Sequence, residues 1–202
     1  MKTISHVYDS YGQARATVRD LESAGIPSRD ISLIANQYVN ERAADVDDAS
    51  ATSTGAGIGI AAGGAAGLLA GLGLIAVPGL GPVIAAGWLA SAAVGVVAGG
   101  VAGAGVGSIV DSLTESGVLE DHAHVYAESV RRGGTLVTAR VADDKLAAAN
   151  TIFARHEPID YGARASVYRR EGWERFDPNA DPYRPSQAEI DRIRARYLGA
   201  EM

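Results

Sequence analysis

Apolar and polar residues follow two periods in the first 36 residues, and the change of period predicts the elements. In Thr3 to Tyr8 (TISHVY) they alternate, which is typical of a strand, and Asp30 to Asn36 (DISLIAN) is a second run of strand-forming residues. Between these runs, residues 10 to 24 carry apolar side chains at helical spacing, and Gly25 stands where a helix C-cap belongs. We therefore expect a strand, a helix and a strand in this order.

The same order recurs later in the chain. Thr135 to Val141 (TLVTARV) has the pattern of a strand, Asp143 to His156 that of a helix, and Ala163 to Arg169 (ARASVYR) that of another strand. Two strand-helix-strand units packed together make an α+β fold, the ferredoxin-like two-layer sandwich (βαβ + βαβ). In this fold, four antiparallel strands carry their helices on one face.

A stretch without charge separates the two units. Between Asp48 and Asp111 lie 62 residues with no Asp, Glu, Lys, Arg or His. Two prolines and two glycines in Val77 to Pro82 (VPGLGP) predict a tight reversal, which leaves two apolar arms at roughly residues 55 to 77 and 83 to 107. Each arm exceeds the roughly 18 apolar residues that mark a membrane-spanning helix. The stretch therefore predicts an inserted glycine- and alanine-rich α-helical hairpin that crosses a bilayer twice.

The glycines within the arms recur every four residues. Of the 25 glycines in the chain, 17 lie between Gly55 and Gly107. Helices in a bilayer pack closely over small residues, and repeated small-xxx-small spacing is typical of that contact. We expect helix packing through two ridges: Gly55, Gly59, Gly63, Gly67 and Gly71 in the first arm, and Gly95, Gly99, Gly103 and Gly107 in the second. The alternative is a soluble homo-oligomer that buries the hairpin in the assembly and acts as a scaffold or binds a small ligand.

Further helical patterns follow the arms. Ser108 to Ser116 and Leu119 to Arg132 are expected to be helices that lead to the third strand. From Glu171 the chain is rich in proline, which predicts an extended linker, and Ser186 to Leu198 begins with a capping-box pattern that predicts a C-terminal helix. The predicted organisation is therefore a first half of the α+β domain (1–48), the glycine-zipper hairpin (49–110), the second half of the domain (111–170), and the linker with its helix (171–202).

Three parts of this sequence are similar to a known family. They are the first strand and helix leading into Gly25-Ile26-Pro27, the glycine-zipper hairpin, and the run from Gly117-Val118 through Tyr126 to Arg132-Gly133-Gly134-Thr135-Leu136-Val137. With these features the chain resembles the general stress proteins that have a heat-induced stress protein YflT-like domain, over about residues 3 to 168. The resemblance implies a stress-associated bacterial protein without an assigned activity, and it carries over no functional residue.

Candidate chemistry is sparse in the sequence. The absence of cysteine excludes disulfides, thiolate metal sites and cysteine nucleophiles, and a formal net charge of −6 argues against binding nucleic acid through its phosphates. His122 and His124 form the one histidine cluster, but residues two apart on a helix point away from each other. His6 and His156 are expected to be structural. With no phosphate-loop or serine-nucleophile motif, we expect no catalytic residue, no cofactor and no metal.

Together these patterns predict a non-enzymatic, stress-associated protein whose cytoplasmic α+β domain is tethered to the cell inner membrane by the hairpin. Both termini are expected in the cytoplasm, because the two halves of one sheet must meet in one compartment and Met1 to Asp9 lacks the apolar core of a signal peptide. The expected partners are the lipid bilayer and further copies of the chain. The sequence identifies no small-molecule ligand.

Overall fold

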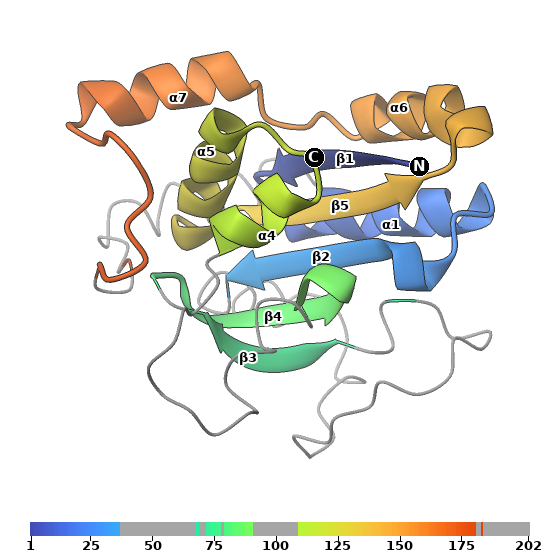
Figure 1. The fold of residues 1–202 in the computed structure, drawn as a ribbon, viewed down its shortest axis with the longest axis horizontal. Helices are drawn as coiled ribbons and strands as arrows, with labels where there is room; N and C mark the ends of the chain where they lie inside the picture. Colours follow the sequence, from blue (N-terminus) through green and yellow to red (C-terminus); the bar gives the residue numbers. More distant parts are fainter. Residues whose placement is uncertain (37–67, 69–71, 78, 91–108, 181–182, 184–202) are drawn as a thin grey trace, which may run out of the picture.

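The computed structural model describes residues 1–36, 68, 72–77, 79–90, 109–180 and 183 (Figure 1). In chain order its elements are β1 (Lys2–Tyr8), α1 (Tyr11–Ser23), the 3-10 turn η1 (Ser28–Asp30), β2 (Ile31–Asn36), β3 (Gly73–Val77), β4 (Gly81–Gly87), α4 (Ile109–Glu115), α5 (Glu120–Arg131), β5 (Thr135–Val141), the 3-10 turn η3 (Asp143–Lys145), α6 (Leu146–Arg155) and α7 (Tyr161–Arg170). The α+β class expected from the sequence is confirmed.

The strands form one five-stranded sheet in the order β1-β5-β2-β4-β3, and every neighbouring pair is antiparallel. β5 lies between β1 and β2, where Val137 pairs with His6 on one side and with Leu33 on the other. The unit β1-α1-β2 is therefore split by a strand from the second half of the chain, as it is in ferredoxin-like folds. Beyond β2, however, the sheet continues into β4 and β3.

Helices cover both faces of this sheet, so the expected two-layer arrangement is wrong. All six residues of β2 are buried, which requires a cover on each face. One face packs against α1 and α6 around Val18, Leu33 and Phe153, and the other packs against α4 and α5 around Ile34, Leu113 and Val130. In Figure 1, α4 and α5 lie in front of the sheet and α1 behind it.

Ala163 to Arg169, expected to be the fourth strand of the sandwich, lies within the helix α7, so this expectation is also wrong. The Asp160 side chain caps the helix by accepting a hydrogen bond from the Ala163 N–H at 2.6 Å. Ala165 and Tyr168 lie on one side of the helix and pack against Val125 of α5. The helix therefore packs on α5 and takes no part in the sheet.

The centre of the uncharged stretch is a β-hairpin. The reversal expected at residues 77–82 is present, with a hydrogen bond from Leu80 N–H to Val77 O at 3.1 Å, but it joins the strands β3 and β4 rather than two helices. Because β4 pairs with β2, the reversal lies in the same sheet as β1 and β2. For residues 73–77 and 81–87, the expected helical hairpin is therefore wrong.

Among the residues that the structure describes, no helix is both long and apolar enough to span a membrane. The nine glycines expected to pack helices, Gly55, Gly59, Gly63, Gly67, Gly71, Gly95, Gly99, Gly103 and Gly107, lie outside the described residues. So does the C-terminal helix expected from Ser186.

Candidate functional site

The segment 171–180, here called the strap, leads from α7 to the turn between β3 and β4. Phe176 anchors it, since its side chain is only 3% exposed and joins the core that contains Leu80 and Leu113. At the turn, Gly79 has a φ of +74°, and a Cβ on this residue would lie 2.7 Å from the Phe176 ring. The sequence predicted an extended linker from Glu171, but this part of it is docked on the domain.

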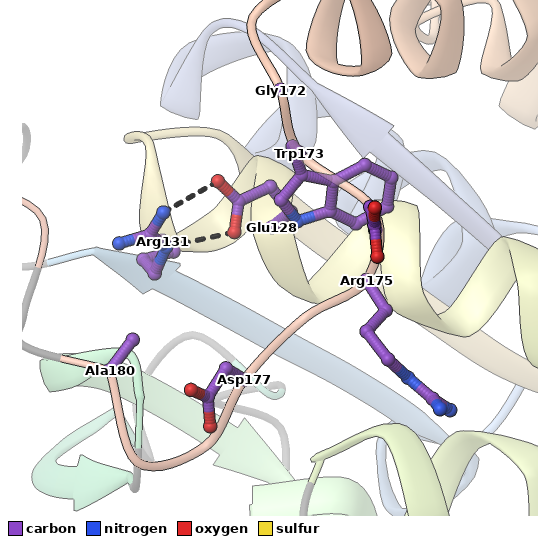
Figure 2. A pocket seen from close by; sticks show the side chains of 8 residues that line it. Glu128, Arg131, Gly172, Trp173, Arg175, Asp177 and Ala180 are labelled. Atoms are coloured by element: carbon purple, nitrogen blue, oxygen red, sulfur yellow. Dashed lines mark hydrogen bonds and ion pairs between the residues drawn. The ribbon is translucent and has the colours of Figure 1, made fainter.

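A hollow of about 370 Å³ lies on one side of the strap (Figure 2). In Figure 2 the Trp173 ring lies beside the carboxylate of Glu128, and Arg131 reaches the same carboxylate from the other side. The lining carries charges of both signs: Glu128, Arg131, Glu174, Arg175 and Asp177. Such a lining selects neither anions nor cations by its net charge.

Glu128 is a buried carboxylate that two arginines neutralise. Its side chain is 1% exposed and accepts hydrogen bonds from Arg131 Nε at 2.8 Å, Arg131 Nη2 at 2.7 Å and Arg132 Nε at 2.6 Å. Arg132 also pairs with Glu171 and lies over the Tyr168 ring at 4.3 Å. Burial lowers the pKa of Arg132, but its bonds to Glu128 and Glu171 outweigh burial and the pKa is raised.

This cluster has a structural consequence. A buried carboxylate is stable only when its oxygens are paired and hydrogen-bonded, and here the pairing ties the C-terminal end of α5 to the end of α7. The spacing of Glu128, Arg131 and Arg132 was visible in the sequence as an (i, i+3) and (i, i+4) pattern. Its burial was not, because that depends on the segment 171–180, which packs beside the end of α5.

A second hollow, of about 700 Å³, lies between the strap, α4 and the start of α5. His124 lines it, with Nε2 lying 3.1 Å from Arg175 Nη2 and 3.6 Å from Glu120 Oε1. Because Arg175 can only donate, Nε2 is the acceptor in this contact, and Nδ1 is the other nitrogen of the ring. That atom is buried and has no partner among the described residues, so a molecule in the open hollow does not reach it.

The remaining histidines have packing roles. His122 stacks on Tyr161 of α7 with ring centroids 3.9 Å apart, and it points away from His124 as the helical reading predicts. His6 lies 5.1 Å from the Phe153 ring, and burial, followed by the charge of His122, lowers its pKa. His156 Nε2 contacts Asp20 Oδ2 at 2.9 Å, which is the main cause of a lowered Asp20 pKa. In the described part of the chain, no three His, Asp or Glu side chains could hold a metal ion together.

The two edges of the sheet differ in their chemistry, and sequence reasoning missed this feature. At the β1 edge, Lys2 is exposed and the Ile159 N–H donates to Val7 O at 2.8 Å. At the β3 edge the sequence is GLIAV, with no charged residue, and the Leu74 side chain is 61% exposed. The sequence did contain a signal for this strand, the short apolar run 73–77 next to the prolines and glycines of 78–82. The long uncharged stretch around the run favoured a helix instead.

Comparison with known proteins adds no relative: no family model, curated protein or solved structure matches this chain. The similarity to the YflT-like stress proteins therefore stays a prediction. The geometry of the described residues carries the functional argument.

Proposed function

We propose that this protein is a non-enzymatic, stress-associated scaffold that acts as a homo-oligomer. The observation that carries the proposal is the pairing of β4 with β2, which makes the centre of the uncharged stretch part of the domain. This favours the alternative in which the apolar insert packs within a protein assembly. Three carboxylates support the non-enzymatic part of the proposal, because Glu128, Asp30 and Asp20 are each paired with an arginine of the domain.

The short distance along the sequence between two buried residues argues against a double membrane crossing by residues 91–108. Ala90 and Ile109 are both buried in the core between the sheet and α4, and only 18 residues separate them in the sequence. Crossing a bilayer and returning as helices takes about 40 residues. The four-residue glycine spacing on either side of the hairpin is suited to close packing against a second copy.

Light scattering after size exclusion, without detergent, tests this function. We expect a mass of two or more chains, and we expect Gly67→Leu and Gly99→Leu to shift the protein toward smaller species because leucine prevents close backbone approach. Ala70→Leu and Ala98→Leu are the matched controls and should shift it less. A wild-type protein that is a monomer at micromolar concentration contradicts the proposal.

A second candidate is the membrane-bound scaffold, which the 62 uncharged residues between Asp48 and Asp111 favour. Its partner would be the lipid bilayer of the inner membrane, with the domain and both termini on the cytoplasmic side. Sedimentation of the protein with membranes after an alkaline wash would support this candidate. Recovery of the protein in the supernatant would support the oligomer without a membrane.

A further inference from the structure

We infer that the outer edge of β3, the edge that faces away from β4, is the surface through which two copies of this chain bind each other. The two β3 strands would pair antiparallel about a two-fold axis at Ile75 and join the two five-stranded sheets into one. This inference rests on the proposed self-association and names the contact that produces it.

The first support is the availability of the edge. β3 pairs with β4 on one side, and within the described part of the chain no strand pairs with its other side. Gly73 and Leu74 are exposed, Leu74 to 61%. An edge strand presents a row of N–H and C=O groups that can extend the sheet with another strand.

The second support is the difference between the two edges. Proteins protect edge strands with charged residues, especially lysine, or cover them with a loop. The β1 edge has both devices, Lys2 and the bond from Ile159 to Val7 O. The β3 edge has neither a charge in 73–77 nor one in its partner strand 81–87. Within the part of the chain that the structure describes, the edge that lacks a charged residue is therefore that of β3.

The third support is that β3 is complementary to itself. With the axis at Ile75, Gly73 lies opposite Val77 of the other copy, and Leu74 lies opposite Ala76. The two Ile75 residues meet on the side of the sheet where Ile75 packs against the core. A second copy is the favoured occupant because an edge without charge offers no complementarity to an acidic or basic peptide.

Cysteine crosslinking tests the register, because the natural chain has no cysteine. In Ile75→Cys the two thiols lie directly opposite each other, at a separation suited to a disulfide, so mild oxidation should convert most of the protein to a covalent dimer. In Leu74→Cys each thiol lies opposite Ala76, so several-fold less dimer is expected. Thr3→Cys on the β1 edge is the matched control and should give only background crosslinking.

A charge at the edge provides the second measurement. Leu74→Lys should weaken self-association by about ten-fold or more, because the pairing brings the two copies of the new charge close together. Leu74 is exposed in the single chain, so this variant should keep the wild-type circular dichroism spectrum. Thr3→Lys at the opposite edge should leave self-association unchanged.

The outcomes separate this inference from the proposed function. If the wild type is an oligomer but Ile75→Cys crosslinks no more than Thr3→Cys, the β3 contact is overturned and the scaffold proposal stands. If Ile75→Cys crosslinks and Leu74→Lys dissociates the oligomer, while Gly67→Leu has no effect, the β3 contact is supported and the glycine ridges are not the interface. A monomeric wild type that crosslinks at neither edge overturns both.

Discussion

β2 and α7 occupy the same place in the two halves of the chain, yet one is a central strand and the other an outer helix. In the sequence, both segments follow a strand and a helix, and both mix apolar and polar residues over about seven positions. β2 has β5 on one side and β4 on the other, so both of its edges are hydrogen-bonded. α7 pairs with no strand, and packs on α5 instead.

The difference shows that the neighbouring segments decide whether a short alternating sequence forms a strand or a helix. The Ile159 N–H already bonds to Val7 O at the β1 edge, just before α7 begins, and Asp160 then supplies the cap that starts the helix. Once helical, Ala165 and Tyr168 fall on one side because they are three residues apart. The same two residues would have pointed to opposite faces of a strand.

The largest effect should come from the core of β2. Leu33→Ala removes a side chain with 0% exposure, so we expect the free energy of unfolding to fall by about 2 to 5 kcal/mol. Val167→Ala on α7, where the side chain is 39% exposed, should change it by less than about 0.5 kcal/mol. Urea unfolding followed by circular dichroism measures both. Equal losses at the two positions would mean that α7 is as central to the fold as β2.

An intermediate effect is expected from the cap of α7. Asp160→Ala removes the acceptor for the Ala163 N–H and should cost about 0.5 to 2 kcal/mol, seen as a lower urea midpoint. Asp144→Ala, at an exposed carboxylate in η3, is the control and should leave the midpoint nearly unchanged. Should Asp160→Ala unfold at the wild-type midpoint, the cap would not be what favours the helix over the strand.

The smallest effect should be a pH dependence at His6 of β1, which lies near His122 of α5 and Phe153 of α6. The pKa of His6 is lower in the folded protein than its ordinary value of 6.5, so the unfolded chain binds the proton more strongly. The His6 contribution to stability is therefore lost as the pH falls from 6.5 through the folded pKa. His6→Gln should lose less stability than the wild type between pH 7 and pH 5, measured by urea unfolding at each pH. Identical losses in the two proteins would assign the acid sensitivity to another group.

Local periodicity was sufficient for the elements that have a clear pattern and clear ends. β5 has the bounds expected for Thr135 to Val141, and α1, α5 and β2 differ from expectation by one or two residues at their ends. In the uncharged stretch, periodicity was not informative, because a run of apolar residues suits a buried strand as well as a helix. The turn at 77–82 could still be predicted, since proline and glycine act locally.

The sequence by itself determined three things: the type and order of β1, α1, β2, α5, β5 and α6, the reversal between Val77 and Gly81, and the absence of cysteine chemistry. Each of these depends on residue type or on neighbours a few positions away. Only the tertiary structure decided which strands are adjacent, that helices cover both faces, that 73–77 and 81–87 are strands, and that 161–170 is a helix. These features depend on hydrogen-bonding edges and apolar surfaces supplied by distant segments. β2 accepts β4 on its free edge, and α5 offers Val125 to α7, and neither partner can be identified from a local pattern.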